Sequence, residues 1–266
     1  MTMIDSIDYK TYNILKTLNS HKFSCVHLVN DESNNKFILK SFQKEIKDHF
    51  IYDENKDEFL PRELFYMNKL SNKVYVPTLL NYHDGLKWST VVMEFLDKGW
   101  TDLFYFVFDY NDEIVIKIIM RNLITICHDM AKDGFYHRDI KPENVMVNRS
   151  TLEVKIIDFE DIYFDKSPEP MSKTTAGTVG YKSPESYLKE LTKLKPSIVF
   201  SIGCVAYSCI ELQETYRNEE ENINCKPLLF RKCSTSAAYF INGCTKKDSE
   251  KRINFHDLLK HRWFCP

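Results

Sequence analysis

The most constraining feature of the chain is a run of charged and polar residues enclosed between two apolar segments. Residues 134–148 read GFYHRDIKPENVMVN, and His137 to Asn144 place basic, acidic and amide side chains next to one another. Before the run, apolar residues recur at helical spacing through 111–132, and Gly134 follows as a helix-ending residue. After it, Val145 to Val147 are apolar. The pattern predicts a polar loop held between a helix and a strand.

This loop resembles the catalytic loop of protein kinases, H-R-D-L-x-x-x-N, with Ile140 in place of leucine. The resemblance implies that Asp139 accepts and orients the proton of a substrate hydroxyl, that Lys141 steadies the γ-phosphate of ATP, and that Asn144 holds a magnesium ion. Lys141 followed by Pro142 favours the serine/threonine branch. The alternative is a charged loop that matches at several positions of specified residue type by chance.

Length and composition limit the other classes. The 266 residues suffice for one large domain or two lobes, and the formal net charge of −2 gives no overall field for nucleic acid or a membrane surface, so we expect neither as a direct partner. The eight cysteines form no C-x-x-C pair, no run of 18 apolar residues occurs, and the first residues lack a signal-peptide core. We expect an intracellular protein, cytoplasmic or nuclear, with free thiols. The sequence does not indicate an oligomeric state.

The residues before the loop predict a β-rich lobe. Apolar and polar residues alternate through 12–40, which predicts two strands, a turn and a third strand ending at Lys40. The segment 44–58 is charged and poor in turn residues, and we interpret it as a helical or mobile insertion. A helix is expected over 60–70, with Pro61 near its start.

Two further strands, 76–82 and 88–95, are expected to form a hairpin. The second strand runs into VVMEFL, which resembles the hinge of protein kinases. The resemblance implies that Met93 is the gatekeeper and that Glu94 to Leu96 offer backbone groups to the adenine.

The first turn of this lobe takes the place of the kinase glycine-rich loop, but its three glycine positions hold Asn19, His21 and Ser24. Because glycine allows positive φ and a close approach of the backbone to phosphate, this loop alone does not identify a nucleotide site. In the context of the other motifs, the resemblance implies that ATP is bound by Leu18, Val26, Lys40, Met93, Glu94, Leu96 and Met146.

Lys40 matches the strand lysine of V-A-I-K, which binds the α and β phosphates, and Glu63 matches the helical glutamate that pairs with it. Taken alone, a lysine at a strand end is usually solvated and a helical glutamate usually forms a surface ion pair. The assignment of both residues therefore rests on the flanking motifs.

Asp158, Phe159 and Glu160 align with the kinase motif D-F-G. The resemblance implies that Asp158 chelates the magnesium ion between the β and γ phosphates. Glu160 stands where the family has glycine, which removes a flexible pivot and adds a carboxylate beside the metal. We expect a stiffer switch that still functions.

Residues 158–185 resemble an activation segment, with Ser183 to Glu185 in place of A-P-E. Thr178 holds the position that bonds the catalytic aspartate and lysine. Thr174 matches the usual activating phosphosite, with Arg138 as the partner of its phosphate. The alternative is an unmodified Thr174 in a constitutively active chain.

A helix over 198–212 resembles the central helix of the large lobe, but Ile198 replaces the aspartate that anchors the catalytic loop. Losing that acceptor should cost about 1–3 kcal/mol unless other groups replace it. Asp248 and Arg252 repeat the family's D-x-x-x-R, in which Arg252 pairs with Glu185. An ordinary helical pair of Asp248 with Arg252 is the alternative.

We interpret the chain as an α+β, two-lobed serine/threonine protein kinase that uses ATP and Mg²⁺, with a β-rich lobe over 1–97 and a mainly helical lobe over 98–266. Its shortness and missing glycines resemble kinases of large DNA viruses, of baculovirus type, which would act in a host cell. Glu143 and Glu219 to Glu221 favour a basic protein substrate. The alternative is a pseudokinase scaffold that acts through protein interactions, which has no physical need to retain Lys40, Asp139, Asn144 and Asp158.

Overall fold

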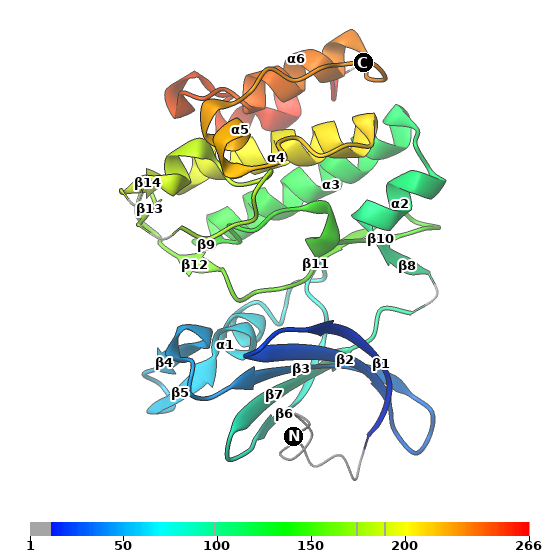
Figure 1. Ribbon diagram of the computed structural model, residues 1–266, viewed down its shortest axis with the longest axis vertical. Helices are drawn as coiled ribbons and strands as arrows, with labels where there is room; N and C mark the ends of the chain where they lie inside the picture. Colours follow the sequence, from blue (N-terminus) through cyan, green and yellow to red (C-terminus); the bar gives the residue numbers. More distant parts are fainter. Residues whose placement is uncertain (1–11, 98, 174, 189, 266) are drawn as a thin grey trace. The chain divides into compact units, whose positions relative to one another are not determined.

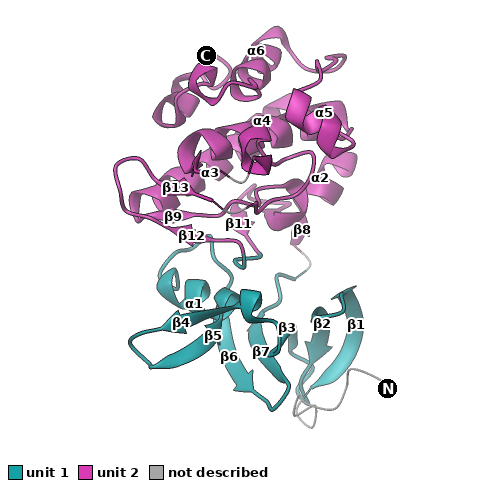
Figure 2. Cartoon of the chain, turned by 60° about the vertical axis from the view of Figure 1, so that its left-hand side comes forward, with its two compact units in different colours: residues 1–97, 158–160 teal, residues 98–157, 161–266 magenta. Residues whose placement is uncertain are grey.

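The chain divides into two compact units (Figures 1 and 2). Unit 1 contains residues 1–97 and 158–160, and unit 2 contains residues 98–157 and 161–266. The computed structural model describes residues 12–97, 99–173, 175–188 and 190–265. Thr174, the residue that matches a phosphosite, lies outside the described residues.

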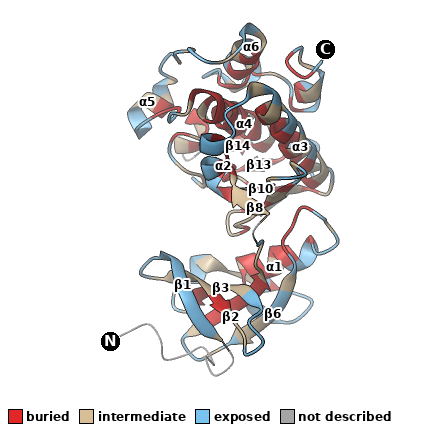
Figure 3. Ribbon diagram, turned by 90° about the vertical axis from the view of Figure 1, so that its right-hand side faces the viewer, coloured by how far each residue is buried: buried red, intermediate tan, exposed pale blue. Residues whose placement is uncertain are grey.

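Unit 1 is built on an antiparallel sheet with the strand order β1-β2-β3-β7-β6. The strands are β1 (Asn13–Ser20), β2 (Ser24–Asn30), β3 (Lys36–Gln43), β6 (Leu79–Asp84) and β7 (Trp88–Glu94). The sheet buries an apolar cluster of Val29, Leu39 and Val92, whereas β1 is exposed along its length (Figure 3). The register places Lys40 opposite Val26. The three strands and the hairpin expected in this part of the chain are confirmed, but β3 continues past Lys40 to Gln43 and β6 begins at Leu79 rather than at residue 76.

The helix expected as one possibility for the segment 44–58 is absent, and that part of the prediction is wrong. The segment forms a short 3-10 turn (Lys47–His49) and a hairpin of β4 (Phe50–Asp53) with β5 (Glu58–Pro61). Phe50 to Tyr52 are strong strand formers, and the Asn55 N–H donates to Asp53 Oδ1 at 3.1 Å within the turn. The expected helix follows directly as α1 (Arg62–Lys69), with Pro61 as its N-cap.

Unit 2 is mainly helical. α3 (Glu113–Lys132) begins at Asp112, whose side chain accepts the Ile114 N–H at 2.7 Å, and the chain leaves it through Gly134 at a φ of +87°. The other helices are α2 (Leu103–Asp109), α4 (Leu194–Glu211), α5 (Glu219–Asn224) and α6 (Thr235–Cys244). With a β-rich unit followed by a helical one, the expected α+β class is confirmed.

Short strands and 3-10 turns connect these helices. β8 (Trp100–Asp102), β10 (Val145–Asn148) and β11 (Val154–Ile156) form one small sheet in the order β11-β10-β8. Two strand pairs join β9 (Phe135–Tyr136) to β12 (Tyr163–Phe164) and β13 (Met171–Ser172) to β14 (Thr192–Lys193). The 3-10 turns span Pro142–Asn144, Pro184–Tyr187, Ser249–Lys251 and Phe255–Lys260.

α4 is the core helix of unit 2 and is buried on nearly every side (Figure 3). It is long and apolar enough to cross a membrane, but 78% of its 18-residue apolar window is buried inside the molecule, as in a core helix. Gly203 lies where α4 meets α6. A Cβ at Gly203 would lie 2.5 Å from Cys244 Cβ, so this approach of the two helices requires glycine.

Candidate active site

The expected carboxylate residues of unit 1, Glu63 and Asp158, lie around the ammonium group of Lys40. Lys40 Nζ lies 3.0 Å from Glu63 Oε2 and 2.7 Å from Asp158 Oδ1. β3 places the lysine inside the sheet and α1 presents the glutamate, so the Lys40 and Glu63 side chains are only 11% and 2% exposed. The ion pair expected between Lys40 and Glu63 is present, and it is buried.

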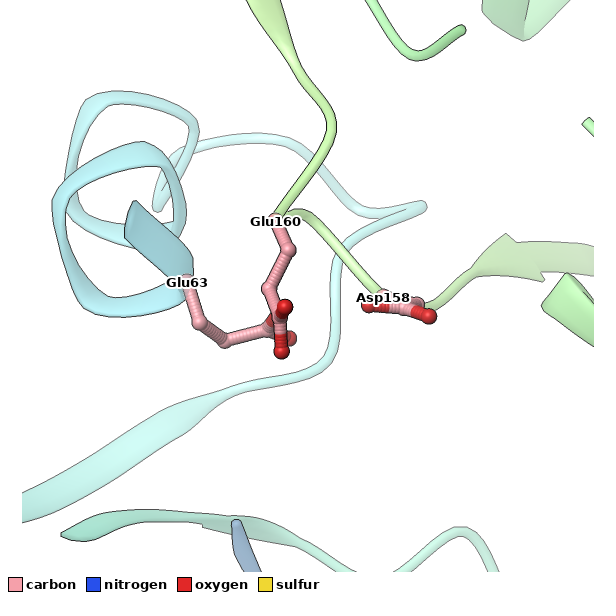
Figure 4. A group of neighbouring side chains, drawn as sticks. All are labelled: Glu63, Asp158 and Glu160. Atoms are coloured by element: carbon pink, nitrogen blue, oxygen red, sulfur yellow. The ribbon is translucent and has the colours of Figure 1, made fainter. Parts of the chain in front are cut away.

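Glu160 adds a third carboxylate to this group (Figure 4). Its Oε1 lies 3.0 Å from Lys40 Nζ, and its Oε2 lies 3.2 Å from His49 Nδ1. Its backbone oxygen accepts a hydrogen bond from Arg62 Nε at 2.6 Å. One carboxylate oxygen from each of Glu63, Asp158 and Glu160 lies within 4.8 Å of the others. Sequence reasoning expected a carboxylate here but found neither its contact with Lys40 nor the role of His49.

Burial and charge act in opposite directions on the pKa values of these groups. Burial lowers the pKa of Lys40, but the carboxylates, Asp158 first, outweigh it and raise that pKa well above its ordinary value. Burial raises the pKa of Glu63 to about 7 against the opposing charge of Lys40. For Glu160, burial again raises the pKa, but His49 and Lys40 together hold it below its ordinary value. Lys40 is therefore a permanent cation at this site.

The segment that carries Asp158 is fixed by its backbone. Asp158 adopts a φ of +68°, a left-handed conformation that is uncommon for a non-glycine residue. The Phe159 N–H donates to Glu63 Oε2 at 2.9 Å, and the Phe159 ring is fully buried. Glu63 therefore holds both the lysine and the backbone next to the expected metal ligand.

The catalytic loop in unit 2 forms a second group of charged side chains. Lys141 Nζ lies 2.8 Å from Asp139 Oδ2. Asn144 Nδ2 donates to the backbone oxygen of Asp139 at 2.9 Å and to its Oδ2 at 3.1 Å. Asp139 and Asn144 are buried although both are polar. The loop therefore has one defined arrangement, in which both amide hydrogens of Asn144 are directed at Asp139.

Thr178 completes this group as expected. Its hydroxyl donates to Asp139 Oδ1 at 2.8 Å and accepts from Lys141 Nζ at 2.8 Å, and its N–H donates to the same Asp139 oxygen at 2.9 Å. Thr178 is thus hydrogen-bonded to both catalytic side chains, Asp139 and Lys141.

Side-chain contacts with backbone oxygens help to hold the catalytic loop, and Ile198 replaces the expected aspartate on α4. His137 Nε2 lies 3.1 Å from Ile157 O, and Arg138 Nε donates to Asp161 O at 2.5 Å. Ile198 is buried and lines a cavity of about 20 Å³ together with Arg138 and four serines, which is room for one water molecule. The loop is therefore anchored to backbone oxygens of Ile157 and Asp161, and Ile198 offers it no hydrogen-bond acceptor from its side chain.

The activation segment is tied to the end of the chain by an ion pair. Arg252 donates to Glu185 through two nitrogens, at 2.7 and 2.6 Å, and the Arg252 side chain is 1% exposed. Asp248 does not pair with it; its side chain accepts the Glu250 N–H and lies 3.4 Å from Lys251 Nζ. The expected pairing of Arg252 with Glu185 is confirmed over the helical alternative.

Most of the residues expected around adenine lie on strands, and Leu96 follows the end of one. Leu18 lies on β1, Val26 on β2, and Met93 is buried on β7. In the expected hinge, the Glu94 N–H donates to Thr78 O at 2.9 Å and Glu94 Oε1 accepts the Thr78 N–H at 3.0 Å. Half-buried residues complete the set, with Leu96 after β7 in unit 1 and Met146 on β10 in unit 2.

The turn that replaces the glycine-rich loop closes without left-handed backbone. His21 N–H donates to Ser24 O at 2.8 Å, and none of Asn19, His21 and Ser24 has a positive φ. The glycines are therefore not required for this hairpin to form. Lys22 places its ammonium 4.9 Å from the centre of the Phe23 ring at the tip.

Comparison with known proteins gives a single answer about the family. The protein kinase domain matches residues 12–264. A serine/threonine-protein kinase 1 of African swine fever virus is 25% identical over 87% of this chain and 76% of its own length. Serine/threonine-protein kinase cds1 of Schizosaccharomyces pombe is 26% identical over 95% of this chain and 58% of its own length. Since the domain match covers nearly the whole sequence, the chain belongs to the protein kinase family.

Proposed function

We propose that the chain is a protein serine/threonine kinase that transfers the γ-phosphate of ATP to serine or threonine hydroxyls. The observation that carries this proposal is the bonded group of Asp139, Lys141 and Thr178, because it orients a carboxylate and an ammonium as phosphoryl transfer to a hydroxyl requires. The relatives from African swine fever virus and fission yeast are named as serine/threonine kinases, which supports the same acceptor.

Each group has a role in this proposal. Asp139 accepts and orients the proton of the substrate hydroxyl, and Lys141 stabilises the transferring phosphate. Lys40, held by Glu63, positions the α and β phosphates. The adenine would contact Leu18, Val26, Met93, Leu96 and Met146. Because the Glu94 N–H is already bonded to Thr78 O, Glu94 would meet the adenine through its backbone oxygen.

We assign Asn144 and Asp158 to magnesium on the chemistry of their side chains, since amide and carboxylate oxygens are its preferred protein ligands. Because the nitrogen end of the Asn144 amide is directed at Asp139, its oxygen end is the one that would hold the ion. Asp158, which belongs to unit 1, offers a carboxylate oxygen of the kind that magnesium prefers. When bound, magnesium offsets the negative charge of the β and γ phosphates.

We also propose that the protein substrate is basic. Glu143 is exposed on the catalytic loop, and Glu219 and Glu220 are exposed at the start of α5. α5 is attached to the activation segment through Asn222, which accepts the Gly180 N–H at 3.0 Å. Glu221 is instead paired with Lys226 at 2.7 Å, so it contributes less to a free acidic surface.

A phosphate-transfer assay tests the activity. We expect the wild type to label histone or protamine from γ-labelled ATP, and Asp139→Ala to abolish labelling. Equal labelling by both proteins, or none by either, would favour the pseudokinase scaffold. A peptide library without enrichment of arginine or lysine before the acceptor would refute only the preference for basic substrates.

A further inference from the structure

The ammonium group of Lys40 is fully engaged by carboxylates before any nucleotide binds. A lysine has three N–H donors. Lys40 Nζ lies 3.0 Å from Glu63, 2.7 Å from Asp158 and 3.0 Å from Glu160. Lys40 is only 9% exposed, so a phosphate that binds it has to replace one of these partners.

Glu160 is the partner that can leave Lys40 without being left unpaired. Glu63 is 2% exposed at its side chain and also accepts the Phe159 N–H, so its departure would break a buried hydrogen bond to the backbone as well as the contact with Lys40. The Asp158 side chain is 41% exposed, but Asp158 is the proposed ligand of the metal, so it has to stay beside the phosphates. Glu160 is 23% exposed, and its other oxygen lies 3.2 Å from His49 Nδ1, so it keeps a partner when it releases the lysine.

We propose that Glu160 is a built-in competitor of the nucleotide phosphates, which occupies Lys40 in the empty enzyme and is displaced when nucleotide binds. The inference rests on the proposed function, because it requires Lys40 to contact a phosphate. Its physical basis is charge: three carboxylates surround one ammonium, so an incoming phosphate meets repulsion that a glycine at this position would not cause.

Calorimetric titration of the full chain with magnesium ADP and with adenosine tests this. In Glu160→Gln and Glu160→Ala we expect ADP to bind about tenfold more tightly than in the wild type, a change of about 1.4 kcal/mol. Adenosine has no phosphate to compete for Lys40, so its affinity should not change. Glu58→Gln, which removes the same charge from an exposed position on β5, should bind both ligands as the wild type does.

The outcomes separate the inference from the proposed function. Equal ADP affinity in the wild type and in the folded Glu160 variants overturns the inference, and so does equal tightening for ADP and adenosine, which would indicate a general change of the site. If neither ligand binds any of the proteins, the proposed function fails together with the inference. Two substitutions are used, and thermal melting identifies which of them folds.

Discussion

Thr178 joins the two catalytic side chains of unit 2 through a single hydroxyl. Asp139 and Lys141 are also paired directly at 2.8 Å, and the Thr178 hydroxyl adds one hydrogen bond to each of them. The Thr178 N–H adds a bond to the same Asp139 oxygen, so the backbone holds the aspartate even when the hydroxyl is removed. The hydroxyl therefore acts on orientation more than on folding.

Thr178→Val should lower kcat by about ten- to a hundredfold, because hydrogen bonds to charged groups contribute about 1.5–3 kcal/mol. The KM for ATP should change little, since Thr178 does not touch the groups around Lys40. Steady-state kinetics at varied ATP checks both quantities, and Thr178→Ser, which keeps the hydroxyl, should recover most of kcat. Loss of activity in the serine variant as well would contradict the assigned role.

At the scale of elements, two long-range contacts fix the parts of unit 2 that surround the catalytic loop. Arg252 joins the last part of the chain to the activation segment through Glu185, and it also donates to the backbone oxygens of Lys246 and Pro196. Gly203 lets α4 and α6 approach so closely that side-chain atoms of Cys244 occupy the space of its missing Cβ. One contact depends on a charge pair and the other on the absence of a side chain.

Arg252→Lys should destabilise the protein by about 1.5–3 kcal/mol, because lysine cannot reproduce the two-nitrogen contact and leaves the carboxylate of Glu185, which is 21% exposed, incompletely bonded. Urea unfolding measures this loss. Lys251→Gln is the control, since Lys251 forms an exposed pair with Asp248 at 3.4 Å, and it should change stability by less than about 0.5 kcal/mol. Similar effects of the two substitutions would show that the buried pair is not structural.

Gly203→Ala should destabilise the protein by about 1–3 kcal/mol, because the new methyl group would have to push α4 and α6 apart. Gly99→Ala is the matched control: a Cβ there would lie 3.5 Å from the Asn148 side chain, an ordinary contact. Thermal melting of both variants compares them. A Gly203→Ala protein as stable as the wild type would mean that α6 can shift without cost.

For the whole molecule, the sequence predicted what is periodic or locally spaced and missed what depends on distant contacts. α3 and α4 were recognisable because their apolar residues repeat over many turns, and the catalytic groups because their spacing is fixed. The hairpin in 44–58 was missed because its strands have four residues each, too few for a clear alternation. The contact of His49 with Glu160 joins residues 111 positions apart, which no local pattern encodes.

The kinase and scaffold hypotheses predict different effects of magnesium and nucleotide on the stability of the protein. If Asp158 binds the metal with nucleotide, ADP at a hundred times its Kd should stabilise the protein by about 2.7 kcal/mol, a rise in Tm of about 5–10 °C. Asp158→Asn should lose the part of the rise that requires magnesium. Asp109→Asn, which removes an exposed carboxylate paired with Arg149, should keep it. Differential scanning calorimetry with ADP, with and without magnesium, measures each case. If the Tm of the wild type rises equally with and without magnesium, Asp158 does not bind the metal. If the Tm does not rise at all, the scaffold hypothesis is favoured.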